Sequence, residues 1–253
     1  MEYPKIYDKR VVINSRDVDG VGECKASALL AYLQDASAEH TSLCGCSRKE
    51  MVERYNVFWM LTRIRLQLTR PVRWLEELTV RTGHRGGRGI LLYRDYELYA
   101  SGERVGEACG LWVLADLDTR KLMDLSRTPI PALTETAGGL SPVIRRLTAL
   151  HPPREMEEVE RRRMRYSDTD VNGHINNTRY ADFACDALAL ERRGQGTFLS
   201  GLEITYHAEC MPGEEIRISR AQRPEGSFVH GEGPAGDARF DIRMELTRQD
   251  NGK

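Results

Sequence analysis

One stretch of the sequence gathers side chains that could hold and activate a water molecule or polarise a carbonyl group. Residues 166–180 read Tyr-Ser-Asp-Thr-Asp-Val-Asn-Gly-His-Ile-Asn-Asn-Thr-Arg-Tyr, and they place a carboxylate, an amide and an imidazole at Asp170, Asn172 and His174. Such groups are suited to general acid–base chemistry. A simple turn needs only one or two Asx or glycine residues. The stretch is therefore either a site or an elaborate cap, and the residue types alone leave both open.

A weaker copy of this stretch lies near the start of the chain. Residues 16–23 match residues 167–174 at an offset of 151, as from Glu23 to His174. Apolar residues at the spacing of one helix face follow each copy. Ser27 is the expected N-cap of the first helix, and Asn176 or Asn177 that of the second. Asn172 and His174 have no counterpart in the first copy, which has Val21 and Glu23 at these positions. The sequence thus predicts a duplicated scaffold.

Alternating patterns predict the strands that must position these groups. Leu202, Ile204 and Tyr206 alternate with polar residues, and residues 64–68 match them at an offset of 138. The smaller offset leaves 13 extra residues in the first copy, which we place between Ser37 and Asn56. Strands are also expected at 76–80, 90–100, 105–116, 214–218, 227–232 and 238–247. Turns are expected at Gly83–Gly89 and Pro224–Gly226.

One long helix followed by an antiparallel sheet, made twice, is an α+β architecture. We expect an N-terminal domain at 1–124 and a C-terminal domain at 159–250. Residues 125–158 would form the linker between them, because they contain five prolines. These are Pro129, Pro131, Pro142, Pro152 and Pro153.

Composition narrows the classes of function. The 253 residues carry a net charge of −1, which argues against nucleic acid as a partner. No apolar run is long enough for a membrane helix, and the first residues lack the apolar core of a signal peptide, so we expect a cytoplasmic protein without membrane contact. The six cysteines lack framework spacing and the histidines lack metal-ligand spacing. We therefore expect reduced thiols, no metal and no cofactor.

The motif Asp-x-Asp-x-x-Gly-His-x-Asn-Asn-x-x-Tyr at 168–180 resembles the signature of hot-dog thioesterases. With Asn172 between Asp170 and His174, it is similar to the acyl-acyl-carrier-protein (acyl-ACP) thioesterases of plants and bacteria. A second family block, Tyr-x-x-Glu-Cys, is present as residues 206–210, in the same order along the chain. The tandem repeat also fits the family, so that the resemblance covers nearly the whole chain.

The resemblance implies two tandem hot-dog domains, each a sheet wrapped around a helix, forming a pseudo-dimer within one chain that could pair again as a homodimer. It implies hydrolysis of fatty acyl-ACP in fatty acid biosynthesis, with the carrier protein as partner. Asp170, Asn172, His174 and Glu209 fall where the family's catalytic network lies, and Cys210 falls where a cysteine nucleophile was once proposed. The first copy has Val21, Glu23 and Pro71 at the positions of Asn172, His174 and Glu209, so the resemblance implies one active site per chain. The N-terminal copy would shape the acyl pocket, with Trp59 and Met60 as candidate wall residues.

Two mechanisms remain open. In the first, Glu209 deprotonates a water molecule, while Asn172 and His174 position the water and the carbonyl. Asp170 orients the network. Backbone amides near His174 and Ile175, at the helix N-terminus, hold the oxyanion. In the second, Cys210 is the nucleophile and His174 its base. Continued alternation from Leu202 puts Cys210 on the apolar face and points Glu209 away from it, unless a bulge re-aims the carboxylate.

Three other functions compete with this reading. An acyl-coenzyme A thioesterase would use the same chemistry on another carrier. A hot-dog enoyl-thioester hydratase resembles this set but has Asn-Pro-x-His spacing, whereas Asn172-Gly173-His174 lacks the proline. A non-catalytic acyl-binding protein is the third. Acyl-chain length depends on pocket depth, which no motif reports.

Overall fold

The computed structural model of the chain describes residues 3–125, 140 and 144–249. They form two compact units whose sequences are interleaved. Unit 1 comprises residues 1–13, 31–66 and 75–147, and unit 2 comprises residues 14–30, 67–74 and 148–253. The first copy of the polar motif, within residues 14–30, therefore belongs to the same unit as the second copy.

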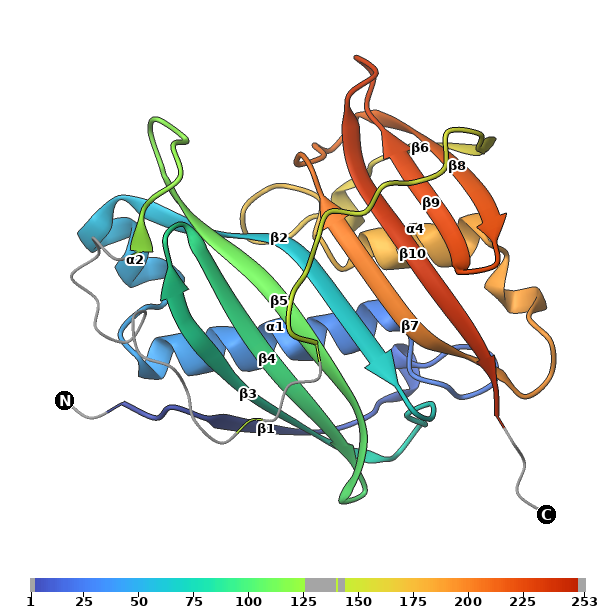
Figure 1. Cartoon of the computed structure of the whole chain (residues 1–253), viewed down its shortest axis with the longest axis horizontal. Coiled ribbons are helices and arrows are strands. Elements are labelled where there is room, and N and C mark those ends of the chain that lie inside the picture. Colours follow the sequence, from blue (N-terminus) through green and yellow to red (C-terminus); the bar gives the residue numbers. More distant parts are fainter. Residues whose placement is uncertain (1–2, 126–139, 141–143, 250–253) are drawn as a thin grey trace. The chain divides into compact units, whose positions relative to one another are not determined.

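Unit 1 is built on an antiparallel sheet (Figure 1). Its strand order is β1 (Tyr7–Val12), β3 (Glu77–Arg88), β4 (Leu91–Ala100), β5 (Glu103–Asp116) and β2 (Val57–Leu68). Helix α1 (Ala26–Leu43), whose first turn lies in unit 2, packs on this sheet through buried Leu33 and Ala36. The Ser37 hydroxyl lies 2.7 Å from the Tyr96 hydroxyl of β4. Helix α2 (Arg48–Tyr55) follows, capped by Ser47.

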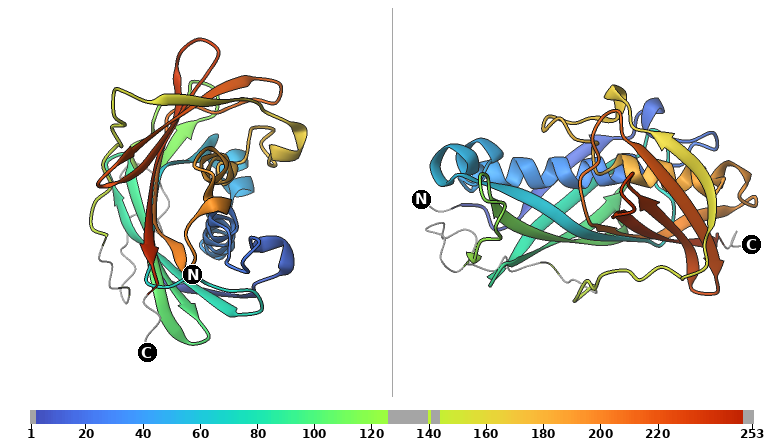
Figure 2. Two further views of the ribbon diagram at one scale, coloured as in Figure 1. Left: turned by 90° about the vertical axis from the view of Figure 1, so that its right-hand side faces the viewer. Right: turned by 90° about the horizontal axis from the view of Figure 1, so that it is seen from above.

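Unit 2 repeats the plan. Its strand order is β7 (Thr197–Tyr206), β10 (Ala238–Arg248), β9 (Gly226–Glu232), β8 (Glu215–Arg223) and β6 (Glu157–Arg163). Helix α4 (Arg179–Ala187) lies along one face of these strands, as Figures 1 and 2 show from different directions. It buries Phe183 and Ala184, and its Tyr180 ring stacks on Phe240 of β10 with centroids 4.8 Å apart. Short 3-10 turns lie at Ser15–Asp17, Tyr166–Asp168 and Leu190–Arg192.

The predicted α+β class is confirmed, and each predicted strand is present. The extra residues of the first copy form the end of α1 and all of α2, inside the expected interval. Strands β1 and β6 were not predicted. Both contain runs of three or more consecutive charged residues and few apolar ones, so their sequences show no alternating apolar face.

Both predicted helix caps are wrong. Helix α1 already begins at Ala26, so Ser27 lies inside it. Helix α4 begins at Arg179 with Thr178 as N-cap, because Asn176 makes a turn of its own just before it. The Asn176 side-chain oxygen accepts hydrogen bonds from the amide and the hydroxyl of Thr178, both at 3.0 Å.

The glycine-rich turn is shorter than expected. Gly89, with φ +59°, joins β3 to β4, whereas Gly83 lies within β3 and Gly86 and Gly87 lie at a register shift of the same strand. Gly226, with φ +138°, closes the predicted β8–β9 turn.

The expected linker is only partly described. Pro129, Pro131 and Pro142 lie outside the described residues, and Pro152 and Pro153 lie in a segment without helix or strand. Strand β6 begins at Glu157, slightly inside the expected linker, and the domain boundaries stay a prediction. Every helix in the described part of the chain is too short or too polar to cross a bilayer.

Candidate active site

The loop that carries the polar motif is closed by its own backbone. The Asp170 amide donates to the His174 carbonyl at 2.9 Å, and the Gly173 amide donates to the Asp170 carbonyl at 3.0 Å. Gly173 has φ +76°, a left-handed conformation that glycine adopts at no steric cost. The Asp170 carboxylate accepts the Asn172 amide at 2.8 Å and the Asn172 side-chain nitrogen at 3.4 Å. Asp170 thus organises the loop and leaves Asn172 and His174 partly exposed at its tip.

Glu209 meets His174 beside this loop. The distance from His174 Nδ1 to Glu209 Oε1 is 3.2 Å, and the two side chains are 25% and 44% exposed. A carboxylate at Nδ1 favours the imidazole tautomer that carries its proton there. Nε2 then has its lone pair available, in a place that water can reach. The structure therefore brings together the imidazole and the carboxylate that come from the two separate sequence blocks.

A bulge at the end of β7 turns Glu209 toward the loop. Strand β7 ends at Tyr206, and the amides of His207 and Ala208 both donate to the Arg239 carbonyl, at 2.9 Å and 3.3 Å. Two amides converging on one carbonyl interrupt the alternation. Of the two orientations that the sequence left open for Glu209, the structure has the one that requires a bulge. His207 itself bonds Asp241 at 2.7 Å through Nε2.

Cys210 lies beneath this surface. Its exposed fraction is 0%, as strand parity predicted. Its amide donates to the Tyr180 hydroxyl at 3.3 Å, and its carbonyl accepts the Ile175 amide at 2.9 Å. Burial raises the pKa of the Cys210 thiol. A protonated thiol without access to solvent is a poor nucleophile, so the geometry speaks against the covalent mechanism.

The predicted oxyanion donors require a correction. The Ile175 amide is bonded to the Cys210 carbonyl and is not free to hold an oxyanion. Helix α4 starts four residues after Ile175, at Arg179. The amides of Thr178 and Arg179 are bonded to Asn176, through its side chain and its carbonyl. The imidazole of His174, beside Glu209, and the side-chain amide of Asn172, on the same loop as His174, remain as candidate polar groups.

The first copy reproduces the loop backbone almost bond for bond. The Asp19 backbone amide donates to the Glu23 carbonyl at 2.9 Å, and the amide of Gly22, which has φ +78°, donates to the Asp19 carbonyl at 3.0 Å. Cys24 donates to the Val72 carbonyl at 2.7 Å, where the second copy joins Ile175 to Cys210. The duplication inferred from sequence is thus conserved within the chain at the level of individual hydrogen bonds.

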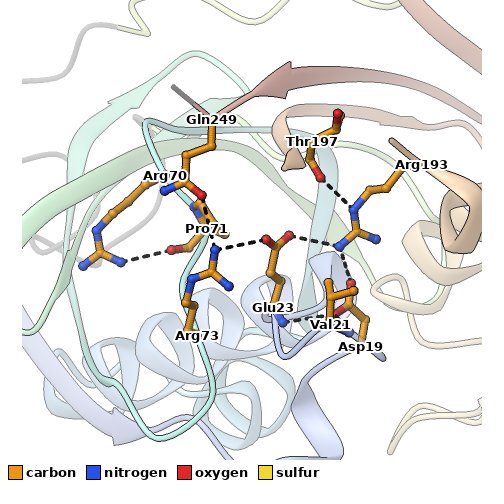
Figure 3. Close-up of polar contacts among 9 residues, drawn as sticks. All are labelled: Asp19, Val21, Glu23, Arg70, Pro71, Arg73, Arg193, Thr197 and Gln249. Carbon is orange, nitrogen blue, oxygen red and sulfur yellow. Dashed lines mark hydrogen bonds and ion pairs between the residues drawn. The ribbon is translucent and has the colours of Figure 1, made fainter. Parts of the chain in front are cut away.

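The side chains of the first loop are engaged in a different way (Figure 3). Glu23 lies between two guanidinium groups, 3.0 Å from Arg193 Nη2 and 3.4 Å from Arg73 Nη2. Arg193 also bonds Asp19 at 2.6 Å and the Thr197 carbonyl at 2.9 Å. Pro71 stands where the second copy has Glu209, so the first copy has no carboxylate at that position. Glu23 and Arg193 are only 13% and 14% exposed, and this carboxylate is held as an ion pair.

A cavity of about 860 Å³ adjoins the first loop. Its lining includes Asp19, Glu23 and Arg193, with Leu29 and Phe198 among its apolar residues. The five predicted catalytic residues are not among these lining residues: Asp170, Asn172, His174, Glu209 and Cys210. The cavity therefore lies between the first loop and residues of the second copy such as Arg179 and Cys185, away from the imidazole.

The expected acyl-pocket residues lie on β2 in unit 1. Trp59 packs against a cluster that includes Cys46, Met51 and Leu114, and its indole nitrogen donates to the Cys46 carbonyl at 3.3 Å. Met60 follows it and is half-buried. Their role in binding an acyl chain stays a prediction. Within the described ranges, no group of three or more His, Cys, Asp or Glu residues is arranged to hold a metal ion.

Sequence reasoning missed two residues that touch the Glu209–Cys210 segment. Tyr180 closes the polar motif, so its place in that motif was a usable signal. Arg239 donates through Nη1 to the Glu209 carbonyl from the start of β10, and nothing in its local sequence indicated this contact.

Comparison with known protein families shows to which family the chain belongs. The family model described as acyl-ACP thioesterase N-terminal domain matches residues 4–128, and the model described as acyl-ACP thioesterase C-terminal domain matches residues 152–245. The chain belongs to the acyl-ACP thioesterase family. The paired family domains agree with the tandem hot-dog architecture expected from the motif.

Individual relatives are distant. The palmitoyl-acyl carrier protein thioesterase of Arabidopsis thaliana, a chloroplastic protein, is 23% identical over 95% of this chain and 60% of its own length. The first curated relatives are covered over only 52–60% of their length. An acyl-ACP thioesterase from Bacteroides thetaiotaomicron shares the fold, with a TM-score of 0.80 at 22% identity over 96% of this chain and 98% of its own. The 12:0-ACP thioesterase from Umbellularia californica gives a TM-score of 0.82 at 18% identity, over 98% of this chain and 100% of its own.

Proposed function

We propose that the protein hydrolyses fatty acyl-ACP thioesters and releases a free fatty acid and the carrier thiol. The observation that carries this proposal is the contact between His174 Nδ1 and Glu209 Oε1 at 3.2 Å, in a chain of the acyl-ACP thioesterase family. Both groups reach solvent, so that a water molecule and an entering thioester can approach them.

In the proposed mechanism, water is the nucleophile. Glu209 takes a proton from water as its oxygen attacks the thioester carbonyl. His174 and Asn172 hold the water and the carbonyl: Nε2 of His174 accepts a hydrogen bond from the water, and the side-chain N–H group of Asn172 donates to the developing oxyanion. Collapse of the tetrahedral intermediate breaks the carbon–sulfur bond, and the leaving thiolate takes the proton back. Asp170 keeps the loop in the conformation that presents Asn172 and His174.

The carrier and the acyl chain form the finer part of the proposal. The relatives bear palmitoyl, oleoyl and dodecanoyl names, so family membership alone does not select a chain length. Thiol release should be measured side by side with acyl-ACP and acyl-coenzyme A over a series of chain lengths. We expect a higher kcat/KM with acyl-ACP. A preference for coenzyme A would reject the carrier, and water addition to an enoyl thioester without thiol release would indicate a hydratase. Binding without turnover would indicate an acyl-binding protein.

The cytoplasmic location and a homodimer stay predictions. The named plant relatives are chloroplastic. Fractionation of native cells and light scattering on the purified chain would test each prediction directly.

A further inference from the structure

The peptide bond between Glu209 and Cys210 is held at both of its polar ends. Its carbonyl oxygen accepts a hydrogen bond from Arg239 Nη1, and its N–H group donates to the Tyr180 hydroxyl at 3.3 Å. A peptide unit bonded at both ends cannot rotate without losing two hydrogen bonds. The side chain of Glu209 starts next to this peptide unit, so the direction in which it leaves the backbone is restrained along with it.

Arg239 joins this peptide to its surroundings. Its side chain is only 13% exposed, and Nη2 bonds the Glu214 carboxylate at 3.1 Å. Asp237 forms a further ion pair, with Oδ2 lying 3.0 Å from Nε. The carbonyl of Arg239 receives the His207 and Ala208 amides that form the bulge. One residue thus sets both the bulge and the peptide that follows it.

Two neighbours keep this arrangement in place. Gly233 leaves the room that the Arg239 guanidinium occupies, because a Cβ atom at residue 233 would overlap it. Phe240, next to Arg239 along β10, stacks on Tyr180 and so supports the hydroxyl at the other end of the peptide. The two hydrogen bonds that hold the Glu209–Cys210 peptide, from Arg239 and to Tyr180, form a clamp. Both ends of this clamp depend on consecutive residues of β10, Arg239 and Phe240.

We propose that Arg239 is a positioning residue for thioester hydrolysis, fixing the Glu209–Cys210 peptide so that the Glu209 carboxylate stays on His174. This inference rests on the proposed function for its kinetic effect, but not for its structural effect. Arg239 bonds the backbone of Glu209 rather than its carboxylate. Arg239 therefore affects the direction of the Glu209 carboxylate, the proposed general base, and does not itself contact the substrate.

The kinetic test compares Arg239→Gln, Arg239→Lys and Gly233→Ala. A misplacement of about 1 Å costs about 10²-fold in rate, so we expect kcat of Arg239→Gln to fall by about that factor with KM little changed. Gly233→Ala displaces the guanidinium without removing it and should act in the same direction. Arg239→Lys keeps the charge without the planar fork and should be intermediate. Arg243→Gln is the matched control, since Arg243 lies on the same strand and pairs with Glu203 instead.

A second readout is independent of turnover. The ¹⁵N shifts of His174 report which ring nitrogen carries the proton, and the wild type should show the Nδ1–H tautomer. Arg239→Gln and Tyr180→Phe should shift this signal toward a mixture, whereas Arg243→Gln should not. An unchanged His174 signal and wild-type kcat in folded Arg239→Gln and Gly233→Ala would overturn the positioning role. If the wild type releases no thiol from any carrier, the proposed function fails, while the His174 signal still tests the clamp.

Discussion

Glu23 and His174 occupy the same backbone position in two loops of one chain. The carbonyl of each accepts the amide of the aspartate four residues before it, Asp19 or Asp170, at 2.9 Å. In one loop the side chain at this position is a carboxylate held by two arginines, and in the other it is an imidazole paired with Glu209. The difference in chemistry between the copies therefore comes from side chains on a common backbone.

Removing either member of the His174–Glu209 pair should abolish most of the activity. A general base contributes about 10² to 10⁴ in rate, so we expect Glu209→Gln and His174→Ala each to lower kcat by a factor in this range. The double variant should lose little more than either single variant, because the two groups act as a unit. Steady-state thiol release on acyl-ACP measures this. Full activity in Glu209→Gln would reject the water mechanism.

Cys210→Ala should be nearly as active as the wild type. Burial raises the pKa of this thiol, so it stays protonated near neutral pH and supplies packing rather than a nucleophile. We expect a loss in kcat of about threefold or less and a small loss of stability, since most single substitutions cost about 0.5–3 kcal/mol. Trapping of an acyl group on Cys210 by mass spectrometry would instead show the covalent route.

Glu23→Gln should reduce stability without a comparable loss of activity in correctly folded protein. Its carboxylate lies between Arg193 and Arg73, and breaking a largely buried pair by removing one partner costs about 3 kcal/mol. Denaturant unfolding should show this loss, and kcat of the folded variant should stay close to that of the wild type. The exposed pair of Lys49 and Glu53 offers a control, because Glu53→Gln should cost less than about 1 kcal/mol. A large fall in kcat for folded Glu23→Gln would mean that the first loop takes part in the chemistry.

His84 should make the protein less stable in acid. Burial, together with nearby Arg94 and His40, lowers the pKa of this ring from 6.5 to about 3. The folded state therefore keeps His84 neutral, while the unfolded chain takes up a proton as the pH falls below 6.5. Stability contributed by the neutral ring is present above pH 6.5 and is lost toward pH 3, by about 1.4 kcal/mol per pH unit.

The variant His84→Leu should flatten this dependence. Urea unfolding between pH 7 and pH 4 would compare it with the wild type and with the exposed control His151→Gln. Parallel slopes for wild type and His84→Leu would show that His84 does not carry the acid sensitivity.

Local sequence patterns predicted those features that depend on local structure. The strands at Leu202–Tyr206 and at 238–247 follow from alternation, and the loop at Asp170–His174 follows from its residue types. Strand β6 was not predicted, because Glu and Arg dominate its sequence and its place in the sheet comes from pairing with β8. The start of α4 was misplaced because Asn176 forms a side-chain turn in competition with a cap.

The features of the candidate site that could not be predicted are set by contacts between distant residues. Glu209 faces His174 only because the Arg239 carbonyl receives two successive amides. The Ile175 amide is unavailable because the Cys210 carbonyl takes it. Arg239 is one of many arginines in this chain, and its neighbours Ala238 and Phe240 gave no reason to select it. Such contacts join segments about 30 or more residues apart, beyond the reach of any local pattern.

Because the two loop backbones are nearly identical, comparing them separates the residues needed for the loop from those needed for the reaction. What both loops share reflects the demands of the turn, and what only one loop has reflects the demands of the reaction. Asp19 accepts the Val21 amide at 3.0 Å just as Asp170 accepts the Asn172 amide at 2.8 Å, although the first loop has no imidazole to serve. By this comparison the aspartate at Asp19 and Asp170 serves the loop structure that both halves share, whereas Asn172, His174 and Glu209 are present in one half alone, where we propose that they carry the reaction.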